Sequence, residues 1–176
     1  MLQETLVILK PDTLERKLSG EVISRFEKKC LEIVDLKYIT KAPKEILLKH
    51  YPDSMALSIG KKAQKVTPSI KDPEAQGKKV LGKLREYFSR GPIIAIIFKG
   101  EDAIKEVRRI TGYTDPKTAE KGTIRGDLGA DSIAISTEEG RAVENMIHAS
   151  GNPEEAEAEI KLWFSKIKIH FHDRAY

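Results

Sequence analysis

Two uninterrupted apolar runs limit the folds open to this chain more than any other feature of its sequence. Residues 5–10 read Thr-Leu-Val-Ile-Leu-Lys, and residues 92–98 read Pro-Ile-Ile-Ala-Ile-Ile-Phe. Neither run alternates between apolar and polar residues, which is typical of strands that are buried on both faces. Both runs are too short to cross a membrane as helices. We therefore expect a layered protein with helices on both faces of a sheet.

Helical and strand patterns alternate along the rest of the chain. Apolar residues recur at helical spacing in segments 22–30, 80–88, 103–110 and 156–164. Residues 33–39 alternate as in a strand with one covered face, on which Val34, Leu36 and Tyr38 lie. Residues 143–148 form the last strand pattern. When insertions at about 52–76 and 128–142 are set aside, the order is β-α-β-β-α-β followed by one more helix.

This order predicts an α+β fold, a ferredoxin-like sandwich whose four-stranded sheet is antiparallel and whose faces carry the helices. At 176 residues the chain fits a single domain spanning 1–176. The insertion at 52–76 is expected to be partly loop and partly short helix. The insertion at 128–142 is expected to be irregular, with a brief strand-like alternation at 132–136.

Several residues carry signals for helix ends and for packing. Ser19 is a suitable N-cap for the helix that follows it. In the last helix, Asn152 is the expected N-cap, Pro153 occupies the first position, and Glu155 can complete a capping box. Cys30, the single cysteine, falls on the apolar face of the first helix, where we expect it to pack in the core.

Composition excludes several classes of protein. One cysteine excludes a disulfide framework and argues against a cysteine-based metal site. The net charge of +4, from 31 basic and 27 acidic residues, does not indicate a nucleic-acid-binding protein and suits a small anionic substrate equally well. The first residues show no basic segment followed by an apolar one, so we expect no signal peptide and a cytoplasmic protein.

The strongest candidate for chemistry is His148, which ends the last strand ahead of a helix. A lone histidine is more often structural than catalytic. Glu159, however, lies on the inward edge of that helix, where a carboxylate needs a partner, and His148 is the obvious one. An acceptor on one imidazole nitrogen leaves the other nitrogen as a nucleophile. Ser150 can orient Glu159 or a transferring oxygen.

Basic and polar residues elsewhere can bind phosphate groups. Lys10 follows the first buried strand, where ligand sites of layered α/β proteins tend to lie, although a solvated lysine is an equally good interpretation of that position alone. Arg108 and Arg125 can supply more positive charge, and Thr114 and Asn145 can form hydrogen bonds to phosphate or sugar. Phosphoryl transfer requires mainly such positioning and charge. The usual phosphate-binding loop and dinucleotide fingerprint are absent from the sequence.

The motifs that contain these residues resemble those of the nucleoside diphosphate kinase family. They stand in the family's order and cover nearly the whole chain: Lys10-Pro11-Asp12, His50-Tyr51, Gly91-Pro92, Thr114-Asp115-Pro116, Gly122-Thr123-Ile124-Arg125-Gly126-Asp127, Asn145-Met146-Ile147-His148-Ala149-Ser150, and Glu159-Ile160 with Trp163-Phe164. The resemblance implies a ping-pong reaction. His148 would accept the γ-phosphoryl group of a nucleoside triphosphate such as ATP and pass it to a nucleoside diphosphate, which maintains NTP and dNTP pools.

The same resemblance implies roles for individual residues. The nucleotide would be held by Lys10, Tyr51, Leu84, Arg108, Thr114, Arg125 and Asn145. Ser150 and Glu159 would support His148. Mg²⁺ would arrive with the nucleotide rather than on protein ligands. The protein would be a homo-oligomer, either a hexamer or a tetramer.

Departures from the family pattern leave alternatives open. Gly151 follows Ser150 where the family usually has aspartate, Val80 stands near the position of a base-stacking phenylalanine, and both insertions are longer than usual. One alternative is a nucleotide-binding module on the same fold that does not transfer phosphate. Another is a nucleic-acid-binding protein that uses the lysine-rich first insertion. His170 and His172 alternate as in a strand, and a further hypothesis is that they bind a metal ion.

Overall fold

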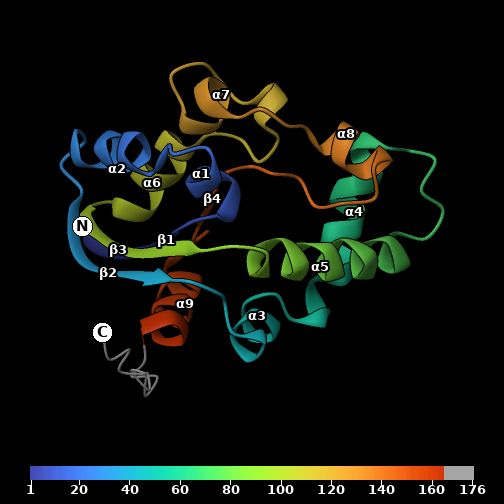
Figure 1. Cartoon of the computed structure of the whole chain (residues 1–176), viewed down its shortest axis with the longest axis horizontal. Coiled ribbons are helices and arrows are strands. Elements are labelled where there is room, and N and C mark those ends of the chain that lie inside the picture. Colours follow the sequence, from blue (N-terminus) through green and yellow to red (C-terminus); the bar gives the residue numbers. More distant parts are fainter. Residues whose placement is uncertain (165–176) are drawn as a thin grey trace, which may run out of the picture.

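The computed structural model describes residues 1–164 (Figure 1). His170 and His172 lie outside the described residues, so a metal site there stays a hypothesis. No helix within residues 1–164 combines the length and the apolar character needed to span a bilayer.

Four antiparallel strands form one sheet in the order β2-β3-β1-β4. Their bounds are Leu2–Leu9 for β1, Glu32–Ile39 for β2, Ile93–Glu101 for β3 and Ile147–Ala149 for β4. The two apolar runs form β1 and β3, the central pair, in which Leu6 lies opposite Ile97. On the other side of β1, Ile8 lies opposite His148. The predicted α+β fold with an antiparallel four-stranded sheet is confirmed.

Helices cover both faces of the sheet because alternate residues of β1 point to opposite sides (Figure 1). Leu6 and Ile8 belong to a core cluster with α3 (Lys44–His50), α5 (Pro73–Ser89) and α9 (Pro153–Phe164). Val7 and Leu9 belong to a second cluster with α2 (Ser19–Glu27) and α6 (Ala103–Thr111). All four side chains are fully buried, and each such burial contributes about 1.5–3 kcal/mol. The unbroken apolar runs therefore reflect two cores that share one sheet.

The first insertion is more helical than the sequence predicts. It contains a 3-10 turn, Asp53–Met55, then α4 (Ala56–Val66), and then the start of α5. α5 begins at Pro73 because the side chain of Asp72 accepts a hydrogen bond from the Ala75 backbone N–H at 3.0 Å. A good N-cap thus extends the helix well ahead of its first apolar residues.

Two glycines let α4 and α5 pack closely against each other. A Cβ on Gly60 would lie 1.6 Å from the Pro73 carbonyl oxygen, and a Cβ on Gly77 would lie 1.8 Å from the Ala56 carbonyl oxygen. Both distances are far inside van der Waals contact, so only glycine fits at these positions. The two helices consequently form a tight pair beside the sheet (Figure 1).

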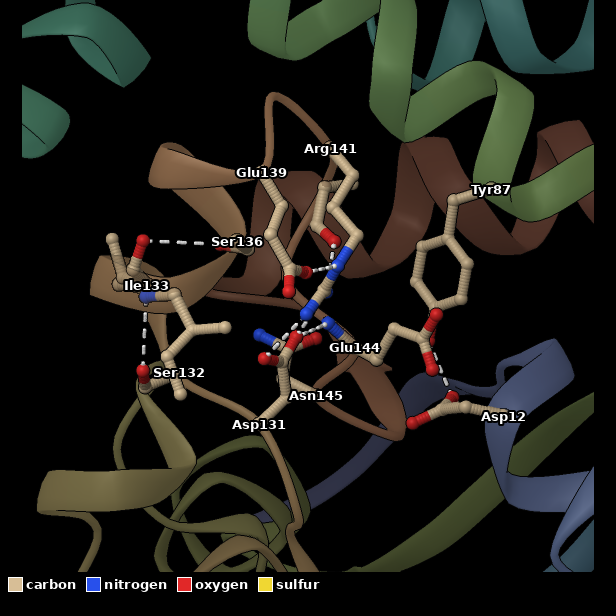
Figure 2. Close-up of polar contacts among 12 residues, drawn as sticks. Asp12, Tyr87, Asp131, Ser132, Ile133, Ser136, Glu139, Arg141, Glu144 and Asn145 are labelled. Atoms are coloured by element: carbon tan, nitrogen blue, oxygen red, sulfur yellow. Dashed lines mark hydrogen bonds and ion pairs between the residues drawn. The ribbon is translucent and has the colours of Figure 1, made fainter.

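The second insertion also contains a helix where the sequence suggested an irregular segment. Residues 132–136 do not form a strand, because Ser132 caps α8 (Ile133–Glu138) by accepting a hydrogen bond from the Ile135 N–H at 3.2 Å. Arg141 joins the ends of the insertion by donating hydrogen bonds to the two carboxylate oxygens of Asp131 at 2.5 and 2.9 Å (Figure 2). Further short helical segments are α1 (Pro11–Glu15), η2 (Pro116–Thr118) and α7 (Ile124–Leu128).

Two predictions about the first long helix are wrong. Ser19 is the first residue of α2 rather than its cap, and Leu18 at the N-cap position makes no side-chain capping hydrogen bond. Cys30 is exposed and lies beyond the end of α2, with a left-handed φ of +59°. The helix ends too early for Cys30 to continue its apolar face, and Leu31 enters the core instead.

The apolar face of β2 is exposed in the single chain. β2 is an edge strand, and Val34, Leu36 and Tyr38 are 47%, 43% and 60% exposed. The predicted strand is confirmed, but the expectation that this face is covered is wrong for the isolated chain. A register shift between Ile33 and Asp35 interrupts the simple alternation on which that expectation rested.

Candidate active site

His148 is held from one side by a carboxylate. Its Nε2 lies 2.9 Å from both carboxylate oxygens of Glu159, and the Ser150 hydroxyl donates a hydrogen bond to Glu159 Oε2 at 2.6 Å. Ser150 is fully buried, whereas the side chains of His148 and Glu159 are 17% and 14% exposed. The structure thus brings together the three residues that the sequence singled out. Because Glu159 occupies Nε2, Nδ1 is the imidazole nitrogen left for a substrate.

The turn between β4 and α9 sets this geometry. Asn152 Oδ1 accepts a hydrogen bond from the Glu155 N–H at 2.8 Å, and Glu155 Oε2 accepts one from the Gly151 N–H at 2.9 Å. The predicted N-cap at Asn152 is confirmed, but Glu155 accepts from the N–H of the residue before the cap rather than from that of the cap itself, as a capping box requires. A Cβ on Gly151 would lie 2.7 Å from Glu155 Oε2. The glycine therefore suits this particular cap, which supports the helix that carries Glu159.

A second histidine, His50, packs against His148. The two ring centroids are 4.3 Å apart and the rings are nearly perpendicular, at 77°. The His50 side chain is fully buried, and Trp163 Nε1 donates a hydrogen bond to its Nδ1 at 3.3 Å. Burial, reinforced by His148 and Lys10, holds the pKa of His50 well below its ordinary value. His50 is therefore neutral and adds no charge beside the His148–Glu159 pair.

Lys10 lies at the carboxyl end of β1 and is only 4% exposed, which excludes the interpretation as a solvated lysine. Its Nζ donates a hydrogen bond to Asn145 Oδ1 at 2.6 Å, and Asn145 Nδ2 donates one to the Thr114 carbonyl oxygen at 2.8 Å. Burial, followed by the positive charge of Arg125, lowers the pKa of Lys10 to about 7. A nearby negative charge favours the protonated amine, so an anion that binds beside Lys10 would raise its pKa.

Arg125 is anchored by backbone carbonyl groups. Its guanidinium donates hydrogen bonds to the carbonyl oxygens of Asn145 at 3.0 Å, Gly112 at 3.0 Å and Ile147 at 2.6 Å. Burial and then the nearby Arg108 lower the pKa of Arg125 to about 10. Within residues 1–164 its hydrogen-bond acceptors are carbonyls rather than carboxylates, so its charge is left for an anionic ligand.

Asp12 and Tyr87 form a buried pair beside this region, and no role was predicted for either residue. The Tyr87 hydroxyl donates a hydrogen bond to Asp12 Oδ1 (Figure 2). Asp12 Oδ2 accepts one from the Met146 N–H at 3.1 Å. Burial is the main cause of the raised pKa of Asp12. The two residues are 75 positions apart, so no local pattern could have revealed the pair.

A cavity of about 310 Å³ opens above these side chains. The predicted site residues that line it are Lys10, Tyr51, Leu84, Arg108, Thr114, Arg125, Asn145 and His148. Ser150 and Glu159 lie behind His148 instead. The sequence did not anticipate a further wall from the two insertions, formed by Met55, Ile59, Lys62, Ala63, Ile133, Ser136 and Thr137. The helical spacing of Met55, Ile59 and Ala63 was a signal that could have identified part of it.

The charge in the cavity bears on whether a metal ion fits. Among the described residues, the charged side chains that line it are all basic: Lys10, Lys62, Arg108, Arg125 and Arg141. His50, His148 and Glu159 are close enough to hold a metal, but Glu159 already pairs with His148 Nε2 and with the Ser150 hydroxyl, and His50 Nδ1 accepts a hydrogen bond from Trp163. A hard divalent cation prefers oxygen ligands, so here it would have to bring them as part of an anionic ligand.

A histidine nucleophile held by a carboxylate and facing a cavity lined with cations is suited to covalent transfer of an anionic group such as phosphoryl. Fold and site therefore define a phosphotransferase. The comparisons with known proteins specify which kind. The family model described as nucleoside diphosphate kinase matches residues 3–68 and 72–169.

Curated relatives that match this chain over nearly its whole length are also described as nucleoside diphosphate kinases. A nucleoside diphosphate kinase of Pyrobaculum aerophilum is 42% identical over 96% of this chain and 98% of its own. One of Pyrococcus furiosus is 38% identical over 99% of this chain and 90% of its own. The chain belongs to the nucleoside diphosphate kinase family.

Solved structures agree in fold. An NDP kinase from Pyrobaculum aerophilum superposes with a TM-score of 0.88 at 39% identity, covering 94% of this chain and 97% of the other. A transition-state mimic of a nucleoside diphosphate kinase from Borrelia burgdorferi, with bound vanadate and ADP, superposes with a TM-score of 0.80 at 34% identity, covering 94% and 88%. The family to which this chain belongs transfers phosphoryl groups between nucleotides.

Proposed function

We propose that this protein transfers the γ-phosphoryl group of a nucleoside triphosphate such as ATP to a nucleoside diphosphate through a phosphohistidine at His148. The reaction would be ping-pong and would maintain NTP and dNTP pools. The observation that carries the proposal is the pairing of His148 Nε2 with Glu159 at 2.9 Å, which leaves Nδ1 as the nucleophile at the cavity. The bidentate carboxylate stabilises the positive charge that develops on the ring as the N–P bond forms.

The remaining residues would bind and orient the nucleotide. Lys10, Arg108 and Arg125 neutralise charge on the phosphate oxygens, which is the main requirement of phosphoryl transfer. Thr114, Asn145 and Tyr51 provide hydrogen-bonding groups for phosphate and ribose, and Leu84 contributes apolar contact. A 2.6 Å hydrogen bond to Asn145 holds the Lys10 side chain in place. The two side chains can therefore bind an entering phosphate group together.

The proposal includes Mg²⁺ carried by the nucleotide. Such an ion would neutralise phosphate charge and fix the geometry of the phosphate chain. The basic lining of the cavity supports the proposal that Mg²⁺ arrives bound to the nucleotide. The protein's own residues would then hold the phosphate oxygens that the metal leaves free.

The direct test is the mass of the intact protein after incubation with ATP and Mg²⁺. We expect one added phosphoryl group that is acid-labile and is lost on addition of GDP, with GTP appearing. His148→Asn, which keeps the size and polarity of the side chain, should give no adduct while retaining its circular dichroism spectrum and its affinity for ADP. An adduct in that variant would refute His148 as the carrier. A wild-type protein that binds ATP without any adduct would instead be a nucleotide-binding module.

We also propose that the protein is a cytoplasmic homo-oligomer, either a tetramer or a hexamer. The exposed apolar residues Val34, Leu36 and Tyr38 on the edge strand β2 support association, because another subunit could cover them. Sedimentation equilibrium would give the subunit number, and a monomer at micromolar concentration would contradict this part of the proposal.

A further inference from the structure

Three helices outside the sheet form one wall of the cavity. In Figure 1, α4, α5 and α8 stand together on the side of the molecule away from α2 and α6. Ile59, Lys62 and Ala63 line the cavity from α4, Val80 and Leu84 from α5, and Ile133, Ser136 and Thr137 from α8. Residues three or four positions apart share one helical face, so each helix turns a single stripe toward the cavity. We call these residues the helical wall.

The helical wall is mostly apolar, whereas the region next to His148 is cationic. Lys10 and Arg125 are joined there through Asn145, and Arg108 lies near Arg125. A ligand with an anionic chain and a flat, partly apolar ring would place the chain at the cations and the ring against the helical wall. On the proposed function, that ring is the nucleobase.

Polar groups in the helical wall differ in whether they are already engaged. The Ser136 hydroxyl donates to the Ile133 carbonyl oxygen at 3.1 Å. The neighbouring Arg141 donates to Asp131 at 2.5 Å and to Glu139 at 2.6 Å (Figure 2). The side chains of Lys62 and Thr137, by contrast, line the cavity and form no hydrogen bond or ion pair with other groups in residues 1–164. These two side chains can therefore form hydrogen bonds with a ligand in the cavity.

We propose that Lys62 and Thr137 contact the edge of the nucleobase, and that Lys62 makes the site prefer bases with an oxo group, such as guanine, over adenine. An ammonium group only donates hydrogen bonds, so it matches a carbonyl oxygen and leaves two donors facing each other at an exocyclic amino group. A threonine hydroxyl can donate or accept and adapts to either. Lys62 therefore sets selectivity, and Thr137 adds affinity for every base.

Exposure of Lys62 limits the size of the effect. A hydrogen bond at a partly solvated position typically changes an equilibrium by about three- to tenfold. We therefore expect GDP to bind about three- to tenfold more tightly than ADP. IDP, which shares the oxo group with GDP but lacks its exocyclic amino group, should bind like GDP rather than like ADP.

The test is titration calorimetry of the unphosphorylated protein with ADP, GDP and IDP in the presence of Mg²⁺. Lys62→Met keeps most of the side-chain length and removes the donor, and it should bring the three dissociation constants to within about twofold of one another. Lys61→Met is the matched control, because Lys61 is an exposed lysine on the same helix that does not line the cavity. Its preference should equal that of the wild type. Thr137→Val should weaken all three ligands by a similar factor.

Several results would overturn the inference: equal binding of the three ligands by the wild type, IDP binding like ADP, or equal loss of selectivity in the Lys61 and Lys62 variants. The last result would mean that general charge, not a contact, is responsible. The inference rests on the proposed function, but the two fail separately. A protein that forms phosphohistidine yet binds all three ligands equally refutes base selection alone. Selective binding without phosphohistidine refutes transfer alone.

Discussion

Replacing Lys10 by methionine should stabilise the protein while destroying its activity. Lys10 is 4% exposed, and its pKa is lowered to about 7, mainly by burial. The difference from the unfolded value corresponds to about 5 kcal/mol of unfavourable free energy for keeping this amine charged in the folded state. The lost hydrogen bond to Asn145 offsets about 2 kcal/mol of that. We therefore expect Lys10→Met to raise the free energy of unfolding by about 2–3 kcal/mol at pH 6.

The lowered pKa of Lys10 also predicts how the free energy of unfolding changes with pH. The folded-state pKa lies below the unfolded one, so the unfolded chain binds more protons between about pH 7 and pH 10. The wild type consequently gains stability as pH rises through that window, whereas the Lys10 variant has no such gain. The stability difference should be largest below pH 7 and smaller by about 2.5 kcal/mol at pH 9.

Urea unfolding at pH 6 and pH 9 can measure this difference through the fluorescence of Trp163, the single tryptophan, which is buried against His50. Protomer concentration must be the same for all samples, because association stabilises the folded state. Lys61→Met, at an exposed lysine, is the control and should differ from the wild type by less than about 0.5 kcal/mol at either pH. A Lys10 variant that is less stable than the wild type at pH 6, or a difference that does not change with pH, would refute the argument.

Other substitutions test the histidine support and the loop that anchors Arg125. Glu159→Gln should slow phosphohistidine formation by about 10²-fold or more, because the ring loses its charge partner, whereas Glu157→Gln, at an exposed glutamate of the same helix, should transfer at the wild-type rate. An unchanged rate in the Glu159 variant in rapid-quench assays would remove that residue from the mechanism. Gly112→Ala should lower the free energy of unfolding by about 2 kcal/mol or more, since Gly112 has a φ of +85° and a new Cβ would lie 2.3 Å from Thr123 Oγ1. Gly20→Ala, on a helix with open space around it, should instead be neutral or stabilising by about 0.5 kcal/mol, and similar melting temperatures for the two variants would contradict the account of Gly112.

The groups around His148 could be predicted because they sit on elements with strong local patterns. Lys10 follows a strand whose burial is plain from its composition, and Glu159 lies on a helix with a recognisable cap at Asn152. The pairing of β1 with β4 places Ile8 opposite His148, so the two segments lie side by side although they are far apart in the sequence. A lysine that looked equally suited to solvent thus proved to be buried.

The helical wall was not predictable in the same way. The packing of α4 on α5 depends on Gly60 and Gly77, where the absence of a side chain permits backbone contact. In a sequence, such glycines are indistinguishable from glycines that merely loosen a loop. Ser132 posed a related difficulty, because a serine before alternating residues fits both a strand and a capped helix.

The position of β1 in the middle of the sheet determines when the site can exist during synthesis. β1 is made before both of its partners, because β3 begins at Ile93 and β4 at Ile147. Before β3 and β4 have been made, both edges of the apolar strand β1 are unpaired. Such a strand can associate with other chains or with a chaperone. Glu159 is made after both partner strands, so a nascent chain on the ribosome cannot form the His148–Glu159 pair until α9 has emerged. The sheet and the His148–Glu159 pair are therefore completed by the same late part of the sequence.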